Sequence, residues 1–350
     1  MHSRCLCQVV LALVFWRCHA DSEPMDINRD KVCTGAGEVD TAEDREACFL
    51  QLPASAQLRT TPSHSGIVDS NVHVWDTSAD YPFDGGKPPA DLGTAGSIEN
   101  LTIANKKDGV DGSLIVQPIN YLYDHGYITA VLQRYCQYRG EGLLHLALGP
   151  SGVAAQMREL ASLKYVAFRY NPSLLDANQS LDGSTSDAVA LTAAELGTPI
   201  AFMFYSGLDQ YSSDLEKLIS RHPNCNFIIE QMGFFLQPAS GEGPRHIVEA
   251  AYIALLSLAK FPNVYVKVAA LYRLYKCSVE ELLPRFTHIF KQFGSQRLMW
   301  GSDFPLALPH GGISQSLKDI RFLLNAVDAT PDQEEQLLGG TVKQLLHFRA

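Results

Sequence analysis

Residues 67–75 read IVDSNVHVW, and their side chains alternate between two kinds. Three valines and a serine occupy the even positions, whereas the odd positions carry Asp69, Asn71 and His73 between an isoleucine and a tryptophan. Successive side chains of a strand point to opposite faces, so this pattern predicts a strand with one apolar face. The other face gathers polar groups toward the C-terminal end of the strand, which makes this segment a candidate for a functional site.

Strand-like and helix-like segments alternate along the rest of the chain. The predicted strands are 67–75, 113–117, 143–149, 166–170, 200–205, 226–232, 264–270 and 298–304. The predicted helices are 123–139, 153–164, 186–197, 209–221, 245–260, 278–293, 313–327 and 331–348. Such alternation indicates parallel βαβ units, and eight of them over roughly 250 residues are the size of a closed (β/α)8 barrel of the TIM type.

An open, doubly wound parallel sheet is the alternative α/β architecture. Its commonest sequence support, a glycine-rich turn after the first strand, is missing here. Two later strands also repeat the pattern of the first. Lys267 opposes a face of valines in 264–269, and Met299, Gly301 and Asp303 share one face of 298–304. Barrel enzymes hold their catalytic groups on the inward face at the C-terminal strand ends, so these positions favour a barrel.

Composition and charge limit the class of partner. The 350 residues are 46% hydrophobic, which is ample for one large core. A formal net charge of −10 makes the chain a poor candidate for binding nucleic acid or anionic membranes. No segment after the N-terminal apolar run is long enough to cross a bilayer, so the expected partner is a small-molecule substrate.

The first 64 residues differ from the rest. Arg4 precedes a short apolar run over 5–16, and Cys18 and Ala20 have the spacing that a signal peptidase accepts. Residues 1–20 are therefore predicted to be a secretory signal, which implies secretion or an endomembrane lumen; an uncleaved apolar tail is the alternative. Residues 21–64 show no sustained periodicity and are predicted to be an irregular extension, leaving 65–350 as the barrel domain.

Five cysteines follow the predicted signal, and an odd number leaves at least one thiol unpaired within a single chain. Cys33 and Cys48 flank a short loop and could pair in an oxidising compartment. No pair of cysteines has the spacing of a zinc ribbon, so a cysteine metal site is not expected.

The first strand resembles the opening strand of the amidohydrolase-related (amidohydrolase 2) family, in particular its lactonase-like branch. That branch includes 2-pyrone-4,6-dicarboxylate lactonases and sugar lactonases, and its first strand usually carries Asp-x-His-x-His. The likeness covers about residues 66–348. Further matching segments are VAFRYNP (166–172), IIEQMG (228–233), NVYVKVAALYR (263–273) and LMWGSDFP (298–305). The resemblance implies a (β/α)8 barrel with hydrolase chemistry.

Two departures from the family pattern concern the metal. Asn71 stands where the family has the first histidine, and Glu230-Gln231 stands where it usually has Asp-His. Asn and Gln offer only a neutral carbonyl oxygen, which is a poor ligand for zinc. The remaining candidate ligands, His73 and Asp303, do not make a zinc site by themselves. No tightly bound metal and no cofactor are therefore expected, with a divalent metal such as zinc as the alternative.

The resemblance implies a lactonase-like hydrolase whose catalytic groups are Asp303 and His73. Asp303 would take a proton from water, and His73 would donate to the oxygen of the carbonyl group under attack. The residues expected to bind substrate are Arg169, Lys267, Gln231, Asn71 and Arg273. Four of these residues also have a purely structural interpretation. Arg169 could pair with Glu230 or Asp303, and Lys267 could neutralise Asp69 or Asp303 inside the barrel. The two amides could hold a decayed site together.

The expected substrate is a small cyclic ester, either anionic or sugar-like. No Gly-x-Ser-x-Gly motif is present, so serine hydrolase chemistry lacks its usual local signature. Two alternatives remain open at this point. One is a metal-dependent decarboxylase of the same superfamily, which metal analysis would reveal. The other is a barrel that binds a small molecule without turning it over.

Overall fold

A computed structural model of the chain describes residues 66–175, 180–239 and 245–348. The predicted signal, the predicted extension and the possible Cys33–Cys48 pair lie outside the described residues. No helix in the described ranges is both long and apolar enough to span a membrane.

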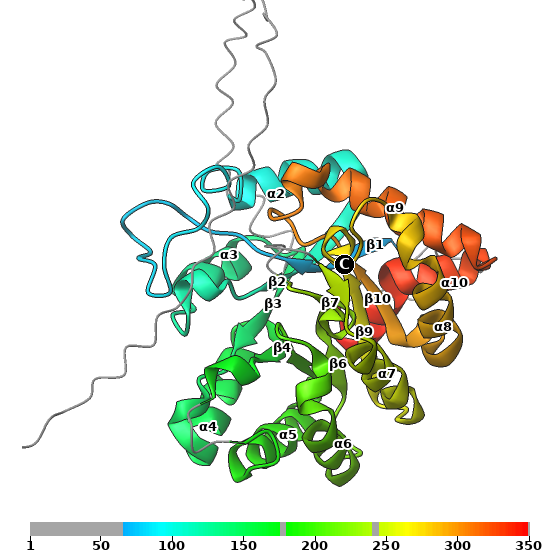
Figure 1. The fold of residues 1–350 in the computed structure, drawn as a ribbon. Helices are drawn as coiled ribbons and strands as arrows, with labels where there is room; N and C mark the ends of the chain where they lie inside the picture. Colours follow the sequence, from blue (N-terminus) through cyan, green and yellow to red (C-terminus); the bar gives the residue numbers. More distant parts are fainter. Residues whose placement is uncertain (1–65, 176–179, 240–244, 349–350) are drawn as a thin grey trace, which may run out of the picture. The chain divides into compact units, whose positions relative to one another are not determined.

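Eight parallel strands form one sheet whose spatial order follows the chain order (Figure 1). They are β1 (Ile67–Val72), β2 (Val110–Val116), β3 (Tyr138–Leu143), β4 (Tyr165–Tyr170), β5 (Ile200–Phe202), β6 (Phe227–Ile229), β9 (Val264–Ala269) and β10 (Leu298–Gly301). A doubly wound sheet would reverse its strand order partway, so the predicted (β/α)8 barrel is confirmed.

Helices connect the strands and lie around the outside of the sheet (Figure 1). They are α2 (Ile98–Asp108), α3 (Gly126–Arg134), α4 (Gly149–Ala161), α5 (Ser184–Leu196), α6 (Ser212–Arg221), α7 (Glu249–Ser257), α8 (Leu283–Phe293), α9 (Gly312–Ala326), α10 (Pro331–Glu335) and α11 (Thr341–Leu345). A two-stranded hairpin, β7 (Leu236–Gln237) with β8 (His246–Ile247), interrupts the connection between β6 and α7.

The barrel closes where the segment after β10 meets the end of β1. The Asp303 amide donates to the Asn71 carbonyl over 2.8 Å, and the His73 amide donates to the Phe304 carbonyl over 2.6 Å. Gly301 permits this approach, because a Cβ there would lie 2.6 Å from the Cβ of Asn71. The seam therefore brings the two predicted catalytic residues together through backbone hydrogen bonds.

The barrel interior is apolar at the end opposite the predicted catalytic residues. Met299 is the register partner of Lys267, so both side chains lie on the inward face. Met299 belongs to a buried cluster that also contains residues of the C-terminal segment. Its members are Val68, Leu114, Ala167, Ala201, Ile228, Met299, Val342, Leu345, Leu346 and Phe348. The last turns of the chain thus pack against the inner strand residues and help to complete the core.

The third strand was predicted in the wrong place. The apolar run 143–149 suggested a strand, but the strand is β3, and the residues after it turn into a short 3₁₀ helix and then α4. β3 contains Gly140 and Gly142, where a Cβ would collide with the side chains of Tyr165 and neighbouring leucines. Large side chains from neighbouring elements occupy the space beside the two glycines. β3 therefore lacks the alternation of apolar and polar residues from which a strand is predicted.

The alternation in β1 was also oversimplified. Val68 packs in the interior cluster, whereas Val72 and Val74 belong to the larger core cluster, so the three valines do not share one face as predicted. The pairing of β1 with β2 is irregular between Asp69 and Val72, which shifts the facing of the later residues. A bulge of this kind re-aims side chains and is frequent near active sites.

Several other boundaries differ from prediction. α2 and the β7–β8 hairpin were not predicted, and the predicted helix 331–348 is divided into α10, a π-helical turn over Gln336–Gly340 and α11. Gly339 explains the turn, because a Cβ there would lie 2.2 Å from the Gly66 carbonyl oxygen. The chain end packs tightly against the start of β1 at this point.

Candidate functional site

Asp303 is the centre of the polar groups at the seam. It lies two residues after β10, has 1% of its surface exposed, and is in contact with four polar side chains. Oδ1 accepts from Asn71 Nδ2 at 3.2 Å and faces His73 Nε2 at 3.5 Å. Oδ2 accepts from the Tyr272 hydroxyl at 2.6 Å and from Arg273 Nε at 3.2 Å. The backbone φ of 68° is left-handed, which Asp tolerates better than most residues.

The charge on Asp303 is stabilised by these donors. Burial alone would raise the pKa of this carboxyl, but the hydrogen bond with His73 and the positive charge of Arg273 outweigh burial and lower the pKa below its ordinary value. Asp303 is therefore an anion across the neutral range, and its four contacts hold it in one orientation.

His73 directly follows β1, and its two ring nitrogens have different partners. Nδ1 lies 3.0 Å from the Val116 carbonyl oxygen, and a carbonyl only accepts, so Nδ1 carries a proton. This contact turns Nε2 toward Asp303. The side chain is 10% exposed. Strand β2 therefore orients the ring, which sequence reasoning did not anticipate.

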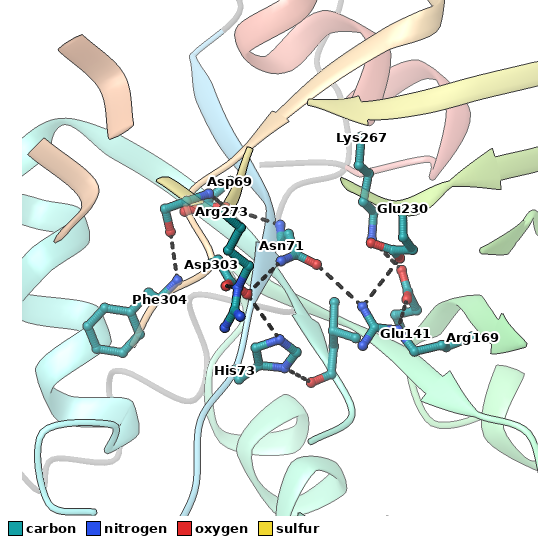
Figure 2. A network of polar contacts seen from close by, with 12 residues as sticks. Asp69, Asn71, His73, Glu141, Arg169, Glu230, Lys267, Arg273, Asp303 and Phe304 are labelled. Carbon is teal, nitrogen blue, oxygen red and sulfur yellow. Dashed lines mark hydrogen bonds and ion pairs between the residues drawn. The ribbon is translucent and has the colours of Figure 1, made fainter. Parts of the chain in front are cut away.

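Asn71 connects Asp303 to a second group of charges (Figure 2). Its Nδ2 donates to Asp303, and its Oδ1 lies 3.5 Å from an Arg169 guanidinium nitrogen. Because Asp303 is an anion and Arg169 is a cation, the NH2 group of the Asn71 amide faces Asp303 and its oxygen faces Arg169. Asn71 is placed to orient Asp303, and its predicted contact with substrate stays a prediction.

Four charged side chains fill the barrel next to Asn71 (Figure 2). Lys267 Nζ lies 2.6 Å from Glu141 Oε2 and 2.9 Å from Glu230 Oε1. Arg169 Nε lies 3.1 Å from Glu141 Oε1, and its NH2 lies 3.4 Å from Glu230 Oε1. We call Glu141, Arg169, Glu230 and Lys267 the charged layer. Each cation in it touches both carboxylates.

The two carboxylates of the charged layer titrate differently. Burial, followed by the neighbouring carboxylate of Glu230, raises the pKa of Glu141 to about 7. At Glu230, the charges of Lys267 and Arg169 outweigh burial and lower the pKa. Glu141 was missed by sequence reasoning. It lies between two glycines in the misplaced third strand, and no local pattern marks it as a partner of a lysine 126 positions away.

The three cations predicted to bind substrate differ in how far their side chains are exposed to solvent. Lys267 is fully buried, and the side chain of Arg169 is 9% exposed. Arg273 is 21% exposed and follows β9 in a short helical turn with Tyr272. Tyr272, which was not predicted, stacks on His310 at 4.3 Å between ring centroids. The predicted roles of the three cations in binding substrate remain predictions, and Arg273 is the best placed of them.

Asp69 joins the two sides of the seam. Its Oδ1 accepts from the backbone amides of Asn71, at 3.1 Å, and of Ser302, at 2.9 Å. Within the described part of the chain, Oδ2 is buried without a hydrogen-bond partner. Burial raises the pKa of Asp69 to about 7. Asp69 thus holds the residues next to Asp303 rather than pairing with Lys267, which was one structural interpretation.

Gln231 follows Glu230 in an unusual backbone segment. Gln231 has φ 46° and ψ 44°, and Met232, Gly233 and Phe234 also have positive φ values. A left-handed run of this length is costly for residues other than glycine. The amide oxygen of Gln231 is buried and has no hydrogen-bond partner among the described residues. Its predicted contact with substrate or with His73 therefore remains a prediction.

The residues at the seam do not fit a tightly bound divalent metal. No group of three or more His, Cys, Asp or Glu side chains gathers to hold a metal ion within residues 66–175, 180–239 and 245–348. The oxygen of Asp303 that faces His73 also accepts an N–H from Asn71, and a donor hydrogen repels a cation. One imidazole and one carboxylate leave zinc short of the ligands it requires.

A cavity of about 430 Å³ lies away from these residues. The loop after β1, α2 and α3 form its walls, with Trp75, Glu99 and Arg134 among the lining residues. Neither His73 nor Asp303 lines it. The polar groups described above converge at the seam and not in this cavity.

Comparisons with known proteins agree with this fold. The sequence profile of the family described as Amidohydrolase matches residues 68–348. No curated protein matches the chain.

Three solved structures illustrate the likeness. A candidate 2-pyrone-4,6-dicarboxylic acid hydrolase from Pseudomonas putida is 20% identical, with a TM-score of 0.66 over 82% of this chain and 99% of its own. A similar candidate from Acinetobacter baumannii with citric acid bound is 17% identical, with a TM-score of 0.63 over 80% of this chain and 99% of its own. A dihydroxybenzoic acid decarboxylase from Polaromonas sp. JS666 with bound manganese and an inhibitor is 11% identical, with a TM-score of 0.59 over 82% and 98%.

Structural likeness at these identities establishes the fold, whereas the family match concerns the sequence itself. That match extends over 68–348 and therefore over most of the 350 residues. It covers the opening strand, the charged layer and the seam. The chain therefore belongs to the amidohydrolase family of hydrolases.

Proposed function

We propose that this protein opens a small cyclic ester by attack of water, with Asp303 as general base, His73 as oxyanion donor and no tightly bound metal. The observation that carries the proposal is the pairing of Asp303 and His73 at the C-terminal end of the barrel, 3.5 Å apart. Membership of the amidohydrolase family and the hydrolases among the similar structures support it.

The reaction divides between the two residues. Asp303 takes a proton as the water oxygen forms its bond to the ester carbonyl carbon. In this proposal His73 acts as an imidazolium: Nδ1–H donates to the Val116 carbonyl, and Nε2–H donates to the oxygen that gains negative charge. When the ring C–O bond breaks, the leaving alkoxide receives the proton that Asp303 holds. The immediate products are a carboxylic acid and a hydroxyl on one open chain. The acid then releases its remaining proton to solvent and becomes a carboxylate, so atoms and charges balance.

In this proposal, water binds between Asp303 and His73. All four acceptor positions of Asp303 are used, and the contact with His73 is the longest of them. A water molecule that replaces this contact would touch both groups while Asn71, Tyr272 and Arg273 keep the carboxylate in place. These three are then positioning residues, and the partly exposed Arg273 is also the leading candidate for contact with substrate.

A metal-dependent decarboxylase is the alternative within the family, and one similar structure is such an enzyme with manganese bound. The proposal favours hydrolysis because Asn71 and Gln231 replace imidazoles and Asn71 donates toward the oxygen that a metal would need. A binding protein without turnover is the second alternative, and only an activity measurement separates it from an enzyme.

The test combines a substrate panel with metal analysis. The panel contains uncharged sugar lactones, 2-pyrone-4,6-dicarboxylate and dihydroxybenzoates, measured with the full chain before and after chelation. We expect ester hydrolysis, less than stoichiometric zinc or manganese, and unchanged rates after chelation. One tightly held divalent ion per chain, with activity lost on its removal, would overturn the metal-free mechanism. Binding of a lactone without turnover would overturn the assignment as an enzyme.

A further inference from the structure

The cations inside the barrel already have anionic partners. Three basic side chains surround the predicted reaction site: Arg169, Lys267 and Arg273. Arg273 contacts Asp303. The other two contact Glu141 and Glu230. Among the described residues of the barrel interior, each of these cations therefore has a carboxylate within 3.5 Å.

Glu141 is arranged as a bound carboxylate ligand would be. Its two oxygens accept from two different cations, Oε1 from Arg169 at 3.1 Å and Oε2 from Lys267 at 2.6 Å. Fork-like contacts of this kind are how proteins recognise a carboxylate. Here the carboxylate belongs to the chain itself, is attached to β3 and is fully buried. It occupies the donors that an acidic substrate would otherwise use.

The consequence follows from the energetics of buried charge. A carboxylate that enters beside Arg169 and Lys267 must either remain without a cation or displace Glu141 from these two partners. Burying a charge without a partner is very unfavourable. Removing one member of a buried ion pair is unfavourable for the same reason, because the other member becomes an unpaired buried charge. An uncharged ligand meets neither difficulty, because the hydroxyls of a sugar exchange hydrogen bonds with water for hydrogen bonds with the site.

We propose that Glu141 is a specificity-determining residue that neutralises the barrel cations and restricts the site to uncharged, sugar-like substrates. This inference rests on the proposed function, because it takes the ligand to be a substrate. The charge argument itself applies to any ligand of the site. Of the two substrate kinds expected from the sequence, it selects the sugar-like one over the anionic one.

The variant that tests the proposal is Glu141→Gln. The amide keeps the shape of the side chain and removes the charge, leaving two cations against one carboxylate. A double variant, Glu141→Gln with Lys267→Met, removes one charge of each sign and restores the balance. Glu195→Gln, at an exposed pair with Arg158, is the matched control for loss of a glutamate elsewhere. Measurements are made at pH 8, where Glu141 is ionised.

The first readout is binding of citrate to the full chain by calorimetry and by its effect on the melting temperature, at matched ionic strength. Wild type and Glu195→Gln should bind citrate weakly. Glu141→Gln should bind it about tenfold more tightly or better, the size expected for one charge-assisted hydrogen bond, and the double variant should lose that gain. Wild type that binds citrate as tightly as Glu141→Gln would overturn the proposal.

The second readout is the ratio of kcat/KM for an uncharged sugar lactone to that for a carboxylated lactone. We expect wild type to favour the uncharged lactone and Glu141→Gln to shift the ratio about tenfold toward the carboxylated one. If no lactone is turned over, the proposed function fails, while the citrate readout still decides the role of Glu141. If Glu141→Gln does not fold, wild type decides alone, because a preference for the carboxylated lactone contradicts the proposal.

Discussion

At the scale of single residues, Asp303 combines two features that are usually kept apart. It is the proposed base, yet four donors contact it and its pKa is lowered. A base with weak proton affinity can still act if the proton is held only in the transition state and then passed to the leaving group. The orientation supplied by the donors offsets part of what low basicity costs.

Asp303→Asn should therefore lower turnover by about 10²–10⁴-fold, because it removes the base. His73→Asn should lower turnover by about 10²–10³-fold through loss of the oxyanion donor. Tyr272→Phe is the matched control, since it removes one hydrogen bond to Asp303 and keeps the carboxylate. Melting temperature and lactone hydrolysis are measured on all three variants. A folded Asp303→Asn protein with near-full activity would show that the reaction site lies elsewhere on the barrel.

Asp69 leads to a prediction about pH and stability. Its pKa is raised to about 7 in the folded protein, above its ordinary value of 3.8, so the native state holds this proton more tightly than the unfolded chain. The stability that this provides is fully present below about pH 4 and is lost as the pH rises through about 7. Asp69→Asn imitates the protonated carboxyl and should remove this contribution to the pH dependence of the free energy of unfolding.

Urea denaturation of wild type and Asp69→Asn at pH 5 and pH 8 measures the difference. Wild type should lose more stability between the two pH values than the variant does. Glu141 has a similarly raised pKa and should contribute to both proteins alike, so the comparison isolates Asp69. Equal pH dependence in the two proteins would mean that Asp69 is ionised in the folded state at both pH values.

At the scale of elements, the seam between β1 and β10 determines the geometry of the site. Asn71 and His73 come from one side, and Asp303 comes from the other. Gly301 stands between them, and a Cβ there would lie 2.6 Å from the Cβ of Asn71 and 3.1 Å from that of Ala269. These neighbours are parts of two strands, so they cannot turn aside as the end of a flexible side chain would.

Gly301→Ala should separate the strands, lower stability by about 1–3 kcal/mol through overpacking, and reduce turnover more than affinity, because it displaces Asp303 from His73. Gly93→Ala is the control, since its Cβ would have an ordinary contact of 3.5 Å with Thr77. The measurements are chemical denaturation, kcat and KM. An active, fully stable Gly301→Ala protein would mean that the seam tolerates a wider spacing than the backbone contacts indicate.

The elements also show which parts of the structure were accessible to prediction. The strand ends were accessible, because polar groups that interrupt an apolar pattern at Asp303 and Lys267 are visible in the sequence. β3 was not, because Gly140 and Gly142 leave its outward space to other side chains. Glu141 was lost with that strand. The pair of Arg169 with Glu230 was foreseen as the structural interpretation of Arg169. The partners of Lys267 were not, because contacts between distant strands depend on register, and the sequence does not reveal register.

At the scale of the whole molecule, the fold was predictable because eight repeats of one unit carry the same signal, so a single misplaced strand did not change the architecture. The interior was less predictable. Its charges are close to balance, and that balance arises from side chains on β3, β4 and β9 and one just after β6. No single segment reveals it, and only the closed barrel brings the four charges together.

The two ends of the chain lead to opposite expectations. Residues 21–64 have no periodic apolar pattern, and the compact unit that contains the barrel begins at His64. A chain that begins at His64 should therefore remain soluble and melt cooperatively, within a few degrees of the full chain.

Removal of residues 341–350 should have the reverse effect. It takes away Val342, Leu345, Leu346 and Phe348, which pack against the inner strand residues in the apolar cluster. Exposing such a cluster costs roughly 1.5–3 kcal/mol for each large side chain, which together equals or exceeds the stability of a typical domain. Both truncations are compared with the full chain by calorimetry and by size-exclusion chromatography. An aggregated protein from the first truncation would place residues before His64 in the fold, and a cooperative melt from the second would mean that the barrel is stable without its C-terminal segment.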